Sequence, residues 1–99
     1  MKSLVEKIRE KMPTLVVFQH TGNQDAADVL IKELEDKYGE RVSIVRVEAS
    51  HNGQYKEEYK LTEYPTYIIY KEGQELMRES GKKTIADLED MIARAGVAS

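Results

Sequence analysis

The 99-residue chain contains no cysteine and no tryptophan, and it has one phenylalanine and two prolines. Without cysteine it can form no disulfide framework and no cysteine-ligated zinc site, and it can perform no thiol chemistry. No apolar run approaches the ~18 residues that a membrane span needs. Lys2, Glu6, Lys7 and Arg9 place charges where a signal peptide needs an apolar core. We therefore expect no membrane association and a cytoplasmic location.

Charge of both signs is abundant and nearly balanced. Charged residues make up 33% of the chain, with 15 basic against 18 acidic residues and a net charge of -3. Interspersed charges of this kind are typical of a solvated surface, so we expect no nucleic-acid partner. The length is close to that of one domain, which predicts a single domain over residues 1–99 and, in the absence of other signals, a monomer.

Helical spacing of apolar residues recurs in three stretches: Ser3 to Lys11, about Asn23 to Tyr38, and Thr84 to the stop at Gly96. A Ser3–Glu6 capping box would begin the first helix, and Pro13 follows it. Thr21 or Asn23 would cap the second helix, and Gly39 would end it in the left-handed conformation. A short, weaker helix is expected around Tyr55 and Tyr59.

Four stretches have strand character: Leu15–Phe18, Val42–Val47, Thr66–Tyr70 and Glu75–Glu79. A helix links the first two, which should therefore be parallel with a right-handed crossover. Lys71-Glu72-Gly73-Gln74 predicts a hairpin turn between the last two, and the alternating Glu75–Glu79 should be an edge strand. These elements predict an α/β fold in which a four-stranded mixed sheet, with a parallel first half and an antiparallel C-terminal hairpin, has helices on both faces.

A run in the second half of the chain sharpens this expectation. Tyr64-Pro65-Thr66 precedes an apolar strand, and the turn at Lys71-Glu72-Gly73, then Gly81, then an amphipathic helix follow. This order resembles the thioredoxin family, in which an apolar residue, a cis-proline and a threonine precede the same elements. The resemblance extends from about Pro13 to Gly96 and implies a thioredoxin-like fold.

The same resemblance places Asn23-Gln24-Asp25-Ala26 in the window of the family's Cys-x-x-Cys motif. Val17 stands where the family has a buried aspartate, and Gln19 stands where it usually has tryptophan. By this resemblance, the two thiols and the aspartate that assists proton transfer in the family are all replaced in this chain. The resemblance implies a redox-inactive member that is not an enzyme and has no catalytic residues.

In the family, the residue before the proline offers its backbone to an extended substrate. By that resemblance, the chain should bind a protein or an extended peptide by partial strand addition, with side-chain contact from Tyr64. The expected groove is formed by Thr21, Gly22, Asn23, Tyr64, Pro65, Thr66 and Gly81. Two alternatives remain: a cysteine-free engineered or scaffold thioredoxin, and a glutathione-dependent enzyme, although such enzymes need a further helical domain.

Other candidate sites have weaker signals. The helix start at Thr21 to Asp25 could bind an anion, but Asp25 already supplies a carboxylate there. His20, His51 and Glu48 should meet at one end of the sheet, yet their spacing is not diagnostic of a metal site. We expect no metal and no cofactor, and we expect most of the six tyrosines to be packing residues.

Overall fold

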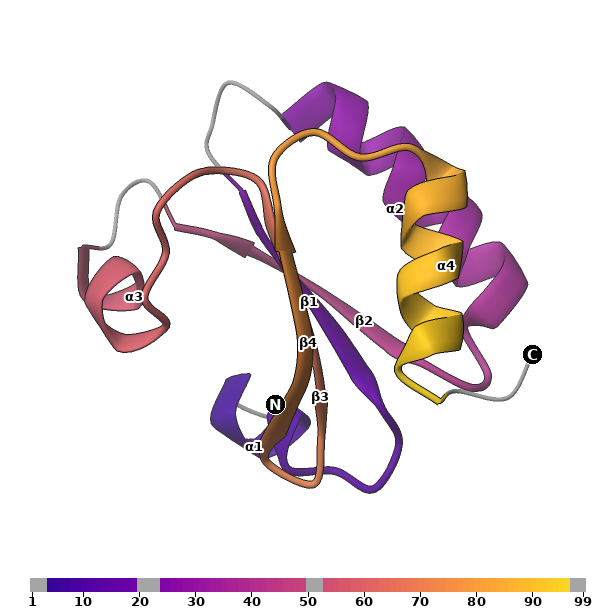
Figure 1. Ribbon diagram of the computed structural model, residues 1–99, viewed down its shortest axis with the longest axis horizontal. Coiled ribbons are helices and arrows are strands. Elements are labelled where there is room, and N and C mark those ends of the chain that lie inside the picture. The colour runs from indigo at the N-terminus through magenta and orange to yellow at the C-terminus, as the bar shows by residue number, and fades with distance from the viewer. Residues whose placement is uncertain (1–3, 20–23, 50–52, 97–99) are drawn as a thin grey trace.

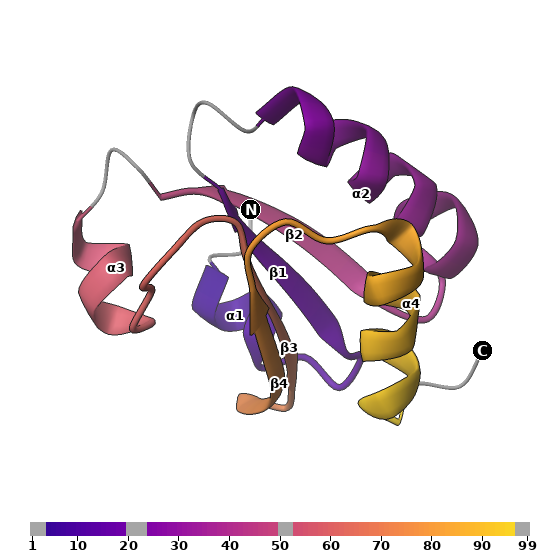
Figure 2. The same ribbon diagram turned by 45° about the horizontal axis from the view of Figure 1, so that its top comes forward.

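The computed structural model describes residues 4–19, 24–49 and 53–96, without the side chains of Val5 and residues 24–28. In chain order the elements are α1 (Leu4–Ile8), β1 (Thr14–Gln19), α2 (Gln24–Tyr38), β2 (Ser43–Glu48), α3 (Gly53–Glu58), β3 (Thr66–Lys71), β4 (Gln74–Ser80) and α4 (Ile85–Arg94). The sheet order is β2-β1-β3-β4; β1 and β2 are parallel, and the other two pairs are antiparallel. Figures 1 and 2 show α2 and α4 on one side of the sheet and α1 and α3 on the other. The expected fold class is confirmed.

Strand β1 lies at the centre of the molecule, and all six of its residues are buried. Successive side chains of a strand point to opposite faces, so β1 contributes to two cores. Leu15 and Val17 belong to the core beneath α2 and α4, whereas Val16 and Phe18 belong to the core beneath α1 and α3. A strand that is covered on both faces explains the unbroken apolar run from Leu15 to Phe18.

The larger core, here called the α2/α4 core, consists of Leu15, Val17, Ile31, Leu34, Val42, Tyr67, Ile69, Leu88, Met91 and Ile92. Polar contacts at its rim join the two helices: the Tyr38 hydroxyl donates to Glu89 Oε2 at 3.1 Å, and Lys37 Nζ lies 3.5 Å from the same oxygen. Thr84 caps α4 and forms a capping box with Asp87. The expected start of the last helix is therefore confirmed.

The second core, here called the α1/α3 core, consists of Ile8, Val16, Phe18, Val47, Ala49, Leu61, Ile68 and Tyr70. Aromatic rings dominate its α3 side. The Phe18 and Tyr59 ring centroids are 5.0 Å apart, and Tyr59 meets Tyr70 edge-on at 6.5 Å. The α3 segment has no buried residue of its own. Tilted aromatic packing of Tyr55 and Tyr59 onto Phe18 therefore fastens it to the sheet.

Helix α1 ends at Ile8, whereas the sequence predicts an end at Lys11. Three donors from outside the helix form hydrogen bonds with backbone carbonyls at or just after its C-terminal end. Thr14 Oγ1 donates to Lys7 O at 3.0 Å, and the hairpin-turn residues Gly73 and Glu72 donate their N–H groups to Ile8 O and Glu10 O. These bonds satisfy carbonyls that have no partner within the helix.

The two central residues of the hairpin turn, Glu72 and Gly73, both adopt the left-handed conformation. Glu72 has φ 52° and Gly73 has φ 87°, and Lys71 pairs with Gln74 across a two-residue loop. Positive φ at both central positions is typical of a type I′ turn, which matches the twist of the flanking strands. The turn predicted at Lys71–Gln74 is confirmed, and β4 is an edge strand as expected.

The expectation of a left-handed Gly39 is wrong. The described left-handed glycines are Gly73, Gly81 and Gly96. Gly39 instead continues the helical bonding by donating to Glu35 O at 2.9 Å, and the N–H groups of Arg41 and Val42 then both bond to Tyr38 O. A Cβ on Gly39 would lie 2.5 Å from Glu35 O, so close approach to the backbone, and not a positive φ, calls for glycine.

We predict opposite effects of Ala at two exposed glycines. Gly39→Ala forces its Cβ against a backbone oxygen and lowers the free energy of unfolding by about 1 to 3 kcal/mol. Gly53→Ala meets nothing within 4 Å and raises it by about 0.5 kcal/mol, through better helix propensity. Urea unfolding followed by circular dichroism measures both; a Gly39→Ala variant as stable as Gly53→Ala would contradict the account.

We predict that stability falls between pH 10 and 12. Burial, and then the Glu75 carboxylate and Tyr59, raise the pKa of Tyr70 from 10.0 to about 12. Because the folded-state pKa is the higher one, the contribution is fully present below pH 10 and is lost as pH rises through 12. The urea midpoint of the wild-type chain should therefore drop more steeply over this range than that of Tyr70→Phe. Parallel curves would show that Tyr70 does not titrate as described.

Candidate functional site

The end of the sheet at which β1 ends and β3 begins holds the candidate groove. The Tyr64–Pro65 peptide bond there is cis. Thr66 Oγ1 donates to Glu63 O at 2.6 Å, and the Gly81 N–H donates to Pro65 O at 2.8 Å. The segment from Glu63 to Thr66 is therefore bonded both within itself and to the residue that follows β4, which fixes its backbone.

Gly81, which bonds to this segment, has a left-handed backbone conformation that favours glycine. Its φ is +89°, and a Cβ placed on it would lie 3.7 Å from Glu63 Oε1. The structure thus brings together Tyr64, Pro65, Thr66 and Gly81. The other residues of the expected groove, Thr21, Gly22 and Asn23, lie outside the described residues.

Tyr64 is partly a structural residue. It is half-buried and packs against the α1/α3 core. Truncating its side chain would therefore remove core packing as well as any contact with a ligand. Pro65 is also half-buried, whereas Glu63, the residue before Tyr64, is exposed.

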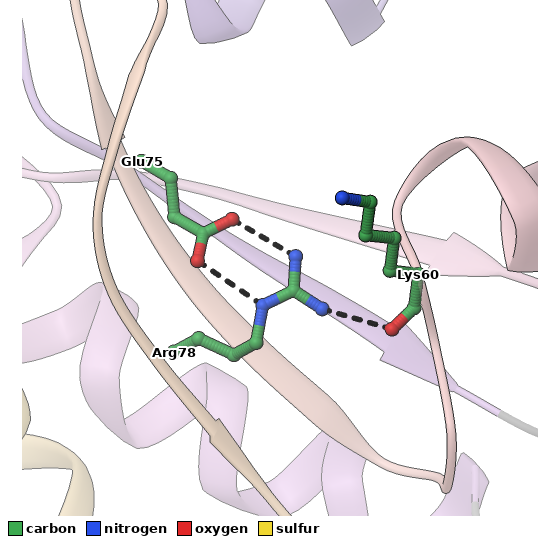
Figure 3. Close-up of polar contacts among 3 residues, drawn as sticks. All are labelled: Lys60, Glu75 and Arg78. Atoms are coloured by element: carbon green, nitrogen blue, oxygen red, sulfur yellow. Dashed lines mark hydrogen bonds and ion pairs between the residues drawn. The ribbon is translucent and has the colours of Figure 1, made fainter.

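Arg78 holds the chain that leads into the groove. Its Nη1 donates to Lys60 O at 3.1 Å, while Nε and Nη2 donate to the two carboxylate oxygens of Glu75 at 3.1 and 2.9 Å (Figure 3). These bonds lower the pKa of Glu75 and keep its carboxylate charged. The guanidinium therefore connects the hairpin with the residues just after α3.

The Lys60 carbonyl points to Arg78 because α3 ends in a Schellman motif. Lys60 has φ 55°, its N–H bonds to Glu57 O, and the Leu61 N–H bonds to Lys56 O at 2.9 Å. Leu61 then enters the α1/α3 core with 3% of its surface exposed. The chain is thereby turned from α3 toward Tyr64 and the groove.

A bulge in β4 makes the Glu75–Arg78 pair geometrically feasible. Residues three apart in a regular strand point to opposite faces. Here Tyr70 pairs with Glu75 and Ile69 with Met77, so Leu76 is an extra residue. The extra residue puts Glu75 and Arg78 on the same face, a consequence that the sequence pattern alone did not indicate.

The window that corresponds to the family's thiols begins α2. Gln24, Asp25 and Ala26 form its first turn; their side chains, and all of Asn23, lie outside the description. Val17, which the resemblance aligns with the family's buried aspartate, is fully buried in the α2/α4 core. The expected helix cap and anion site at Thr21 to Asp25 remain predictions.

The histidine hypothesis falls largely outside the described part of the chain, since it involves His20 and His51. Glu48 is half-buried at the end of β2. Within residues 4–19, 24–49 and 53–96, no three metal-ligating side chains come together. In the same ranges, no helix combines the length and apolar character of a membrane span.

Sequence reasoning missed one unusual feature of this end of the sheet, the burial of the Gln19 amide. Gln19 is only 3% exposed, and its Nε2 has no hydrogen-bond partner in the part of the chain that the structure describes. The resemblance identifies this residue only as a replacement for the family's tryptophan. A glutamine at the end of a β-branched strand was the available signal, because such a residue must bury a polar group.

Comparison with known proteins identifies the family. The Thioredoxin family profile matches residues 24–94, so the chain belongs to the thioredoxin family. A search of curated proteins gives no match.

Three solved structures show the same fold. "Structure of a malarial protein" has a TM-score of 0.75 and 20% identity, covering 87% of this chain and 99% of the other. "Crystal structure of a designed protein" has a TM-score of 0.80 and 21% identity, covering 97% and 86%. Deadhead, a germline-specific thioredoxin from Drosophila melanogaster, has a TM-score of 0.76 and 19% identity, covering 87% and 83%.

We predict that the two buried polar residues at the ends of β1 respond oppositely to apolar substitution. Gln19→Leu removes an unbonded amide donor and raises the free energy of unfolding by about 1 kcal/mol. Thr14→Val removes a hydroxyl that bonds to Lys7 O and lowers it by about 1 to 2 kcal/mol. Urea unfolding measures the free energy of unfolding of both variants and shows whether it rises in Gln19→Leu and falls in Thr14→Val. Loss of stability in Gln19→Leu would mean that the amide has a partner.

Proposed function

We propose that this thioredoxin-family domain is redox-inactive and binds an extended protein segment along Tyr64, Pro65 and Thr66. The observation that supports this most is the anchored loop, in which Pro65 O bonds to the Gly81 N–H and Thr66 Oγ1 bonds to Glu63 O. The loop is held in place although the chain has no cysteine that could use it for disulfide exchange. Binding is the activity that such a loop can still support.

The binding mode is strand addition. The β1–β3 ladder ends at the Phe18–Thr66 pair, so the backbone of residues 63–65 extends beyond the paired part of β3. An extended segment can place its own backbone next to this stretch and add hydrogen bonds at the end of the sheet. Because the Glu63–Thr66 backbone is already fixed, little conformational entropy is lost in the protein on binding.

Side chains at the rim would select the segment. The Glu63 carboxylate lies over Gly81, and Lys82, which directly follows Gly81, is exposed. Two opposite charges thus stand next in sequence to Tyr64 and Gly81, and they favour a segment with complementary charges. Tyr64 would add contact area through the part of its side chain that the α1/α3 core leaves uncovered.

A cysteine-free scaffold is the second candidate. The designed protein among the structural neighbours supports this alternative, although 21% identity indicates only the shared fold. Under it, the anchored loop would serve stability and the chain would need no ligand.

The test uses peptides selected from a displayed random library on the immobilised, intact chain, followed by titration into the ¹⁵N-labelled protein. We expect amide shift changes to cluster at residues 62–66 and 79–82. Glu63→Arg should weaken binding several-fold, because it reverses a rim charge. Glu57→Arg makes the same charge reversal at an exposed residue of α3 and should leave affinity unchanged.

Two results would count against the proposal. Shift changes centred on α2 and α4 would place binding elsewhere on the domain. Failure to enrich any peptide, with the loop amides unmoved by the whole library, would favour the scaffold alternative.

A further inference from the structure

The Gln19 side-chain amide is a buried hydrogen-bond donor for which the described residues supply no acceptor. The residue is 3% exposed, and Nε2 has no partner within the described ranges. The other buried polar side chains are bonded: Thr14 Oγ1 to Lys7 O at 3.0 Å and Thr66 Oγ1 to Glu63 O at 2.6 Å. Buried polar groups in folded proteins are almost always paired, so an exception calls for an explanation.

Gln19 also adjoins the candidate groove. It is the last residue of β1 and pairs with Glu48, and its carbonyl accepts from the Ala49 N–H at 3.0 Å. On the other side of β1, Phe18 pairs with Thr66, so the next position along β3 is Pro65. The unbonded amide is therefore carried by the strand end that borders Tyr64–Pro65.

The backbone at this position is fixed, but the amide is not. The Gln19–Glu48 pair of the β1–β2 ladder holds the main chain of Gln19 in register, whereas the β1–β3 ladder ends one residue earlier, at Phe18–Thr66. A glutamine side chain has three rotatable bonds, and no hydrogen bond restrains this one through Nε2. Because Nε2 is buried, contact with a ligand in the groove requires rotation about those bonds. This rotation breaks no hydrogen bond of Nε2 with the described residues.

We propose that Gln19 is a ligand-contacting residue, whose amide donates a hydrogen bond to a main-chain carbonyl oxygen of the extended segment bound beside Tyr64–Pro65. This inference rests on the proposed function and specifies its chemistry, because it gives the groove a side-chain donor for one peptide carbonyl. It explains why a polar group that costs stability stands at the end of an otherwise apolar strand.

The experiment titrates one library-selected peptide, whose binding has been mapped to residues 62–66, into the intact wild-type chain, Gln19→Leu and Thr14→Val. Loss of one hydrogen bond should weaken binding to Gln19→Leu by about five- to thirtyfold. Thr14→Val changes a buried polar residue at the opposite end of β1 and should bind like the wild type. Weaker binding by a variant that is more stable than the wild type would exclude misfolding as the cause.

A second measurement separates contact from packing. Each carbonyl of the peptide is replaced in turn by a thiocarbonyl, which is a weaker acceptor. One position should weaken binding to the wild type, and the same replacement should have no effect on Gln19→Leu, as a double-mutant cycle requires for a direct interaction.

The outcomes distinguish this inference from the proposed function. Groove-mapped binding that is equally tight in Gln19→Leu overturns the role of Gln19 and leaves the groove in place. Equal sensitivity of both proteins to every thiocarbonyl replacement also overturns it. If no peptide binds at residues 62–66, both proposals fail together.

Discussion

Burial of β1 on both faces is the constraint on which the rest of the structure depends. Every one of its six residues is buried, and it pairs with β2 on one side and β3 on the other. Its side chains alternate between the two faces of the sheet and contribute to two separate cores. Helices must therefore cover both sides of the sheet, and the loops at the strand ends become the places where the backbone can reach a ligand.

Polar contacts supplement the apolar packing that holds α1 and the chain after α3 on the sheet. The hairpin turn donates two N–H groups to carbonyls at the end of α1, and Arg78 joins the hairpin to Lys60 O. Both contacts converge on the β3–β4 hairpin, so this hairpin positions α1 at one end and the chain leading to the groove at the other. The Arg78 contact thus supplements the bonds of Glu63, Thr66 and Gly81 that fix the groove itself.

Local signals in the sequence predicted most of the fold. The apolar run of β1, the Thr84 start of α4 and the turn at Glu72-Gly73 are each encoded within a few residues. The premature end of α1 and the crowding at Gly39 depend on atoms from other turns or elements, which periodicity does not reveal. The bulge at Leu76, and with it the Glu75–Arg78 pair, likewise follows from strand register.

The candidate site was predictable only in part. Tyr64, Pro65, Thr66 and Gly81 were expected together from a resemblance in the sequence, and the structure brings them together. The buried, unbonded amide of Gln19 could not be read from the sequence, because satisfaction of a polar group is decided by its surroundings. Family membership explains the scaffold, whereas the absence of cysteine restricts what the scaffold can do.

The central claim is that the sheet end beside Tyr64–Pro65 serves as a binding surface for an extended segment. The most direct test is a crystal structure of the chain with a library-selected peptide. The account predicts an extended peptide beside Tyr64–Pro65, with main-chain hydrogen bonds to that loop. A peptide seated on the outer edge of β2 or β4, or on the α2 and α4 surface, would contradict it.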